Sequence, residues 1–325
     1  MQKELFNELY SSLVLEIKKE FKFFNIDIET KDDDIIVAYM NWRRRFISNI
    51  KRKVFLSKEL NKNPKYKSYK KVVNKLISKF RNGEDITSFL SKGIVDNPYS
   101  QNIKSRSTDK DIFLNAFGIH HLHLNNVYEQ KQKCGISFIK RNNDLLYILI
   151  EHDKVYFINI DKHNFGNQYL FQIIKNNWEY LIEKYELRGL ISTEEEELTD
   201  QMMYELISHG VSVSIRLEDK VYCNCDLVSS GHNGSWMFDY KKLMEQLEQI
   251  SFSLTYHYAD LKKNINLKHN NHFDELELKF VVQKGYVYLI ECKSCYTITI
   301  NYKKSVFEIY ETYCLQNKYI LDFNY

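Results

Sequence analysis

A chain of 325 residues, of which 44% are hydrophobic and 27% charged, has the composition of a globular protein with a packed core, which excludes a disordered or fibrous chain. No run of 18 apolar residues occurs, and the first residues lack a secretory signal, so we expect neither a membrane span nor export. The six cysteines are then expected to be free thiols in the cytoplasm.

Positive charge is concentrated near the start of the chain, although the net charge is only +3. Residues 41–81 contain 15 lysines and arginines and one acid, Glu59. Such an excess predicts a polyanionic partner, and we favour nucleic acid over an acidic protein surface or a membrane face. The expected backbone contacts are Arg43, Arg44, Arg45, Lys51, Arg52 and Lys53.

The first expected region, residues 1–110, is helical and basic. Apolar residues four apart predict an amphipathic helix over 2–25. The same spacing of Trp42, Phe46, Ile50 and Val54 predicts a second helix over about 35–57. A third helix is expected over 66–81, after Pro64.

The second region, residues 111–190, changes to strand-like sequence. Short apolar runs separated by Asn and Asp turn residues predict a four-stranded antiparallel meander, followed by a helix over 167–184. The expected strands are 118–124, 136–140, 145–151 and 154–160.

Two further regions follow. Residues 191–265 are expected to form a helix (200–209), a hairpin that turns at Glu218-Asp219, and a long helix over 236–265 whose apolar period near 3.5 predicts packing along another helix. Residues 266–325 are expected to form short antiparallel strands with Gly285 in a tight turn. The predicted fold class is therefore α+β.

The most function-like segment is the strand Gly118-Ile119-His120-His121-Leu122-His123-Leu124. Because side chains alternate across a strand, His121 and His123 share one face, and His120 lies on the other with two leucines. We expect His120 to point to the core and the other two to point to solvent, a cleft or a partner domain.

Neutral imidazoles two residues apart on a strand can chelate a metal, transfer protons or, when charged, hold phosphate. If the meander brings the end of the last strand near the histidines, Lys162 and His163 join them, with Arg141 a weaker candidate. No second tight histidine spacing is present, so we favour metal-free acid–base chemistry without a cofactor. The candidate catalytic set is His120, His121, His123, Lys162 and His163.

Several segments together resemble a widespread bacterial protein family of unassigned activity. They are the basic run after Trp42 with VFLSKEL, then DIFLNAFGIHHLHL, LLYILIEHDKVYFINIDKH, Asn177-Trp178, and ELTDQ with the later DKVY. The family is marked by its GIHHLHL segment, and the resemblance covers about 42–265. It implies that His120, His121, His123 and His163 belong to a family pattern. The expected strand order is also loosely similar to that of RelE-type toxin ribonucleases, at the level of the fold.

A second constellation lies near the C-terminus, where Asp274 precedes the E-x-K of Glu291 and Lys293. This arrangement resembles the magnesium-binding core of PD-(D/E)xK nucleases, in which carboxylates hold the ion. The segment after the E-x-K predicts another strand where that family has a helix, so a solvated strand face is the favoured interpretation.

Phosphate-binding glycine loops and serine-esterase motifs are absent from the sequence. The leading hypothesis is a metal-independent ribonuclease of bacterial toxin or phage-defence type. The alternatives are a non-catalytic protein that binds nucleic acid or a cognate partner, such as an antitoxin or a defence sensor, and a magnesium-dependent nuclease at the C-terminus.

Overall fold

The computed structural model describes residues 2–96, 111–190, 198–223, 233–270, 272–301, 306–311 and 319–323. The fold class is α+β, as the sequence predicted. The chain forms two compact units, residues 1–44 with 236–325, and residues 45–235. The sequence indicated four consecutive regions instead, because the pairing of an N-terminal helix with distant C-terminal elements leaves no local signal.

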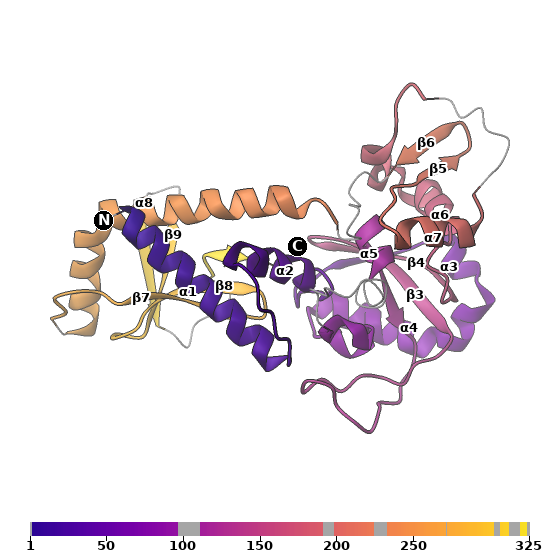
Figure 1. The fold of residues 1–325 in the computed structure, drawn as a ribbon. Helices are drawn as coiled ribbons and strands as arrows, with labels where there is room; N and C mark the ends of the chain where they lie inside the picture. Colours follow the sequence, from indigo (N-terminus) through magenta and orange to yellow (C-terminus); the bar gives the residue numbers. More distant parts are fainter. Residues whose placement is uncertain are drawn as a thin grey trace. The chain divides into compact units, whose positions relative to one another are not determined.

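The first unit combines the two ends of the chain. Its sheet has the strand order β10-β9-β8-β11, with β7 paired to β8, and the pairings are antiparallel. The amphipathic helix α1 packs against β7 and against the long helix α8, which confirms the helix–helix packing predicted from the apolar period (Figure 1). The elements are α1 (Gln2–Phe23), α2 (Asp32–Arg43), α8 (Trp236–His269), β7 (Leu278–Gln283), β8 (Tyr286–Glu291), β9 (Tyr296–Asn301), β10 (Val306–Glu311) and β11 (Leu321–Asp322).

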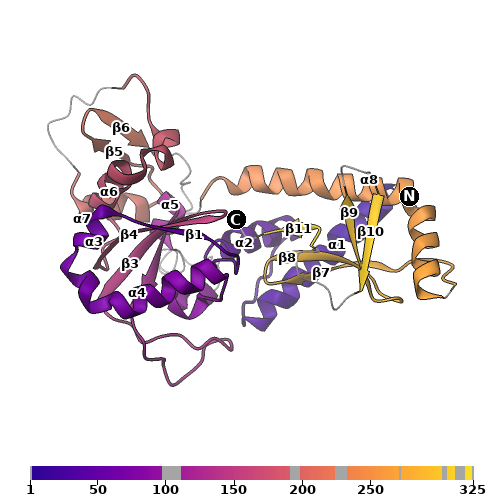
Figure 2. The ribbon, with the colours of Figure 1, turned by 180° about the vertical axis from the view of Figure 1, so that it is seen from behind.

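The second unit is built around a four-stranded sheet of order β1-β4-β3-β2. The strands β2, β3 and β4 are antiparallel, whereas β1 runs parallel to β4 along the edge (Figure 2). The strands are β1 (Lys53–Leu56), β2 (Ile119–His123), β3 (Asp144–Glu151) and β4 (Lys154–Lys162), and a separate hairpin joins β5 (Ser214–Leu217) to β6 (Lys220–Cys223).

Helices cover both faces of this sheet (Figure 1). On one face α4 packs against β1 and β4, and on the other α5 packs against β2 and α6 against β4. The second face buries Ile119, Leu145, Tyr147 and Tyr156 in one apolar core with residues of α5, α6 and α7. The helices are α3 (Lys58–Lys62), α4 (Pro64–Asn82), α5 (Ile112–Phe117), α6 (Tyr169–Trp178) and α7 (Asp200–Ser208).

The predicted helix over 35–57 is wrong in its second half. Helix α2 ends at Arg43, and residues 53–56 form the edge strand β1. Val54 pairs with Val155 of β4, about a hundred residues later. Its four-residue spacing from Ile50 is therefore not helical, and a parallel pairing of this range cannot be recognised from a local apolar period.

The predicted meander is also wrong in one strand. Residues 136–140 are not part of the sheet and make only isolated bridges, one between Tyr128 and Ile139 and one between Lys133 and Ile136. Cys134 and Gly135 have φ values of 49° and 73°, which turn the chain back on itself immediately before this segment. The fourth strand of the sheet is β1 instead. The predicted helix over 167–184 likewise ends early, at Trp178, and continues as short 3₁₀ turns.

Other elements follow the sequence closely. The hairpin turns at Glu218, which has a left-handed φ of 59°, and the turn between β7 and β8 has positive φ at Lys284 and Gly285. Among the helices of the described residues, none has both the length and the apolar character required to cross a membrane.

Ser57 joins the end of β1 to the helices that follow, and its substitution tests this arrangement. Its buried hydroxyl donates to the carbonyl of Ile158 at 2.6 Å and accepts from the N–H of Leu60 at 2.8 Å as the cap of α3. We expect Ser57→Ala to lower the free energy of unfolding by about 2 kcal/mol. The exposed Ser68→Ala on α4 is the matched control, with a change within about 0.5 kcal/mol in urea denaturation. Equal effects of the two substitutions would contradict the anchoring role of Ser57.

Candidate functional site: a histidine cluster at the end of the central sheet

The histidine strand β2 starts where Gly118 ends α5 in the left-handed conformation, with φ of 67°. In the register of β2 with β3, His121 lies opposite Tyr147 and His123 opposite Leu145. Tyr147 and Leu145 belong to the core beneath α5, α6 and α7, so His121 and His123 occupy that face. His120 occupies the face covered by α4, which is the alternation that the sequence predicted.

Burial of the pair differs from the expectation. His121 and His123 are only 6% and 4% exposed, so neither side chain points freely to solvent. The helices on this face of the sheet and the ring of Phe165, 5.1 Å from that of His121, cover them. A polar strand in a two-sided sheet is buried wherever both faces carry helices, and the sequence of the strand alone does not reveal this.

The histidines nevertheless converge. The ring of His121 lies 6.0 Å from that of His123 and 5.8 Å from that of His163, measured between centroids. His163 follows the end of β4, is exposed, and packs on Phe165 at 4.2 Å. The cluster thus has one imidazole at the surface and two beneath it.

Asp111 supplies a carboxylate to the buried part of the cluster. It is the N-cap of α5, where Oδ1 accepts from the N–H of Leu114 at 3.1 Å. Its Oδ2 lies 3.4 Å from Nδ1 of His121, an ion-pair contact that lacks hydrogen-bond geometry. Nδ1 of His123 is buried as well, and none of the described residues forms a hydrogen bond with either nitrogen. Asp111 therefore places a carboxylate beside the central imidazole of the cluster.

Burial keeps the other imidazoles neutral. It lowers the pKa of His123 to about 3, and the neighbouring His121 and Arg141 act in the same direction. Burial also lowers the pKa of His120 to about 4, against the opposing charge of Asp111. The pKa of His163 is lowered by burial and then by His121 and Arg141. These rings are neutral at pH 7, so His123 is not a proton donor there.

Lys162 is not part of the cluster. In the sheet register His123, Leu145 and Asp161 lie opposite one another, whereas Lys162 lies opposite Asp144. Adjacent positions alternate between faces, so the exposed Lys162 side chain is on the other face from His123. A shift of one residue in the register of β4 would place Lys162, in the position of Asp161, on the face of His123.

The cation of the cluster is Arg141. Its charge lowers the pKa of both His123 and His163, and its side chain is exposed. Within the described part of the chain, no residue forms an ion pair or hydrogen bond with its guanidinium. The sequence signal was its position just before β3 (Asp144–Glu151), whose first residues lie beside the end of β2.

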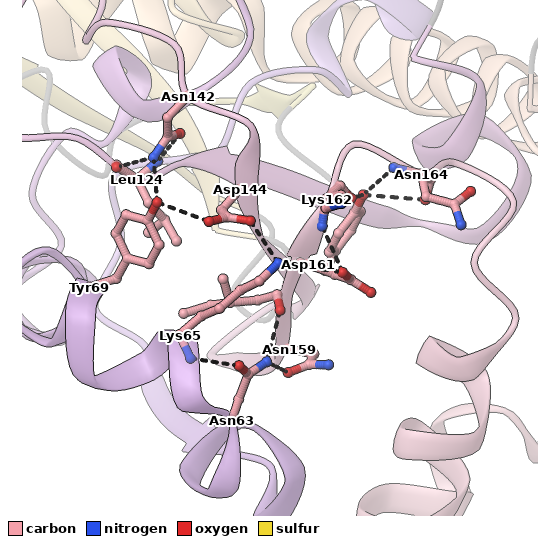
Figure 3. Close-up of polar contacts among 12 residues, drawn as sticks. Asn63, Lys65, Tyr69, Leu124, Asn142, Asp144, Asn159, Asp161, Lys162 and Asn164 are labelled. Atoms are coloured by element: carbon pink, nitrogen blue, oxygen red, sulfur yellow. Dashed lines mark hydrogen bonds and ion pairs between the residues drawn. The ribbon is translucent and has the colours of Figure 1, made fainter.

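A polar network that the sequence analysis missed fixes this end of the sheet (Figure 3). Lys65, in the first turn of α4, lies 2.7 Å from a carboxylate oxygen of Asp144 and 3.7 Å from one of Asp161. Tyr69 donates to Asp144 at 3.0 Å, and Asn167 donates to Asp161 at 2.9 Å. These contacts join the start of β3 and the end of β4 to α4 and to the loop before α6. Asp161, at the end of β4, is two residues from His163.

Several arginines that were expected to bind nucleic acid bind the chain's own carbonyl groups. The guanidinium of Arg43 donates to the carbonyl of Lys284 at 2.8 Å within the first unit. That of Arg45 donates to the carbonyls of Gly93 at 3.2 Å and Asp96 at 3.1 Å. Both arginines are buried, so they cannot present a charge to a polyanion in this conformation.

The other four residues of the predicted nucleic-acid-binding set include both paired and exposed side chains. Arg52 is buried and donates to the carbonyl and the hydroxyl of Ser48, each at 2.7 Å. Arg44 lies 3.4 Å from a carboxylate oxygen of Asp239. Lys51 and Lys53 are exposed, and no carboxylate of the described residues forms an ion pair with either of them.

The two charged residues of the C-terminal E-x-K, Glu291 and Lys293, form hydrogen bonds with neighbouring residues in this conformation. Glu291 is fully buried and accepts from the N–H of Glu277 at 2.8 Å and from the N–H and hydroxyl of Ser294, each at 2.6 Å. Burial raises its pKa, but the hydrogen bonds from Ser294 and the backbone outweigh burial and leave the pKa below its usual value. Lys293 donates to the carbonyl of Glu275 at 2.8 Å, away from Glu291.

The segment after the E-x-K is the strand β9, as the sequence predicted, and not a helix. Asp274 contributes its backbone carbonyl to Lys262 at 3.1 Å. Over the residues that the structure describes, no group of three or more His, Cys, Asp or Glu side chains is placed to hold a metal ion.

Comparisons of the chain with protein-family models, with curated proteins and with solved structures found no match. Function is therefore inferred from the geometry of the histidine cluster and from the charge of its surroundings.

The neutral His120 makes stability depend on pH. Its folded pKa of about 4 lies below the ordinary 6.5, so the unfolded chain binds the proton more readily, and the contribution to stability is lost as the pH falls from 6.5 towards 4. When the pH falls from 7 to 5, we expect the free energy of unfolding of His120→Leu to decrease by about 2 kcal/mol less than that of the unsubstituted chain, as measured by urea denaturation. The exposed turn residue His152, as His152→Gln, is the control. Identical pH dependence in all three proteins would refute a buried neutral His120.

Proposed function

We propose that the chain is a metal-independent ribonuclease that uses the histidine cluster for acid–base chemistry. The observation that carries the proposal is the convergence of three imidazoles, two from β2 and one just after β4, with a carboxylate beside the central ring of His121 and an exposed arginine whose charge acts on His123 and His163. Cleavage of RNA through its own 2′-hydroxyl requires a proton acceptor, a proton donor and a cation, and no metal ion.

In the proposed reaction His163 is the imidazole that contacts substrate, because it is the exposed member of the cluster. Its lowered pKa leaves it neutral at pH 7, so it can accept the proton of the 2′-hydroxyl as the 2′-oxygen bonds to phosphorus. The bond from phosphorus to the 5′-oxygen then breaks, and the protonated ring returns its proton to that oxygen. The products are a 2′,3′-cyclic phosphate and a 5′-hydroxyl.

The buried members support the outer ring in this scheme. Asp111 orients His121, and the ring of His121 packs edge-on to His163, with an angle of 75° between the planes. Arg141 is the group that would neutralise the charge that develops on the phosphorane. We assign no proton transfer to His123, because its pKa of about 3 keeps it neutral.

A second candidate function is non-catalytic binding of nucleic acid or of a cognate protein partner. The observation that favours it is the burial of His121 and His123, which leaves one imidazole in direct reach of a ligand. The ribonuclease would be of bacterial toxin or phage-defence type, and the non-catalytic protein would be an antitoxin or a phage-defence sensor; either would act in the cytoplasm. The magnesium-dependent alternative has less support, because the carboxylate of Glu291 already accepts three hydrogen bonds.

Loss of the outer or the central imidazole should abolish activity. We expect the full chain to cleave labelled single-stranded RNA in the presence of EDTA, and His163→Ala and His121→Ala to reduce the rate at least 100-fold. His209→Ala, on an exposed histidine outside the cluster, is the control and should retain full activity. Cleavage that EDTA stops and that Glu291→Gln reduces would support the C-terminal alternative, and binding without cleavage would support the non-catalytic function.

Asp111 can be tested without removing the helix cap. Asparagine caps helices as well as aspartate does, so Asp111→Asn should leave the thermal midpoint nearly unchanged. The substitution removes the charge beside Nδ1 of His121, and we expect a fall of 10- to 100-fold in the rate and a changed pH–rate profile. An unchanged rate and profile would show that the contact has no part in the reaction.

A further inference from the structure

The exposed face of α4 carries a row of lysines that the catalytic proposal does not use. Lys67, Lys71 and Lys75 are four residues apart and exposed, and Lys70 lies beside the row. The helix contains no acidic residue. Like charges at this spacing destabilise a helix, so solubility alone does not explain why the row is unbroken.

These charges are not neutralised within the described part of the chain. No carboxylate there forms an ion pair with Lys67, Lys70 or Lys71. At the two ends of the helix, Lys65 pairs with two carboxylates and Lys79 with one. The ammonium group of Lys75 lies over the rings of Phe89 and Tyr128, 5.5 and 5.8 Å from their centroids, and keeps its charge there. The middle of α4 therefore carries a strip of positive charge that no carboxylate of the described residues neutralises. A strip of this kind attracts a polyanion and releases its counterions on binding.

A depression at the edge of the sheet adjoins the last turn of α4, because Arg81 is part of its lining. This depression, of about 580 Å³, is lined by four cationic residues (Lys51, Arg52, Lys53 and Arg81), by one acidic residue (Asp153), by Val54 and by Phe55, whose side chain is 38% exposed. The ring of Phe55 stacks on that of Tyr156 at 5.3 Å with an angle of 17° between the planes, so it is held flat. A supported aromatic ring among cations is typical of surfaces that bind unpaired bases and their phosphates.

The other end of α4 leads towards the histidine cluster. Lys65, in its first turn, contacts the ends of β3 and β4, where the exposed Lys162 and His163 follow one another. The helix has 19 residues, which corresponds to a length of about 28 Å. A single strand that lies along the whole of α4 would therefore extend over several nucleotides, from the depression lined by Arg81 to the junction at Lys65.

We infer that the strip formed by Lys67, Lys70, Lys71 and Lys75, together with Lys51, Lys53, Phe55 and Arg81, is the binding surface for single-stranded RNA. This inference rests on the proposed function for its substrate class, and it extends that function by naming where the strand lies. The nucleic-acid contacts are thus assigned to α4 and β1 and not to the buried arginines. Lys162 lies between this binding surface and the histidine cluster.

Binding can be measured without the chemistry by using a labelled 20-nucleotide 2′-O-methyl RNA, which has no 2′-hydroxyl to attack. We expect the triple substitution Lys67→Glu, Lys70→Glu and Lys71→Glu to raise Kd at least 30-fold in fluorescence anisotropy. The slope of log Kd against log salt should fall by about 2, because three fewer phosphates are neutralised. The matched control is Lys241→Glu, Lys242→Glu and Lys263→Glu on exposed positions of α8, which has the same change in charge.

The outcomes separate this inference from the ribonuclease proposal. Tight binding that the α4 substitutions weaken supports the binding surface even if no RNA is ever cleaved. Equal Kd values for the α4 and α8 variants would overturn it, also where the histidine cluster cleaves RNA normally. Stronger binding to duplex RNA or to vesicles that contain phosphatidylserine, lost in the α4 variant, would overturn single-stranded RNA as the ligand.

Discussion

The coverage of both faces of one four-stranded sheet determines how its histidines can act. Helix α4 packs on β1 and β4, helix α6 packs on β4 and helix α5 packs on β2, which is buried along its whole length. Imidazoles in such a strand lose hydration, and the cost of charging them lowers the pKa of His120 and His123 far below neutrality. Among the clustered imidazoles, the one that reaches solvent is that of His163, at the end of the sheet where β4 emerges.

That end of the sheet is held by charge and hydrogen bonds more than by apolar contact. Lys65 lies between Asp144 and Asp161, and Asn167 closes the group from the side of α6. The network lies between the lysine strip of α4 and the exposed His163. In the account proposed here, one rigid junction positions both the strand-binding surface and the ring that reacts.

Features with a local or periodic origin could be predicted from the sequence. The helices α1 and α8 follow from apolar periodicity, and the hairpin of β5 and β6 from its turn residues. The opposite facing of His120 and His121 follows from strand alternation alone. The sequence predicted that His163 would lie near His121 if the register of the sheet brought the end of β4 close to the histidine strand. The structure has that register, and the two rings lie close together.

The errors arose where distant segments decide the structure. Val54 belongs to a strand because Val155 is there to pair with it, and the spacing around Val54 carries no sign of this. Arg45 and Arg52 are buried and donate to backbone carbonyls of turns, so a basic run predicted a surface charge that the fold uses internally. Lys162 missed the cluster by one position, since a shift of one residue moves a side chain to the other face of a sheet.

The chemistry of the RNA ends tests the central claim most directly. Mass spectrometry of a short RNA, incubated with the full chain in EDTA, distinguishes the two routes of phosphodiester cleavage. The account predicts fragments that end in a 2′,3′-cyclic phosphate and begin with a 5′-hydroxyl, because the 2′-oxygen is the nucleophile. Fragments with a 5′-phosphate and a 3′-hydroxyl, or an RNA left intact, would contradict it.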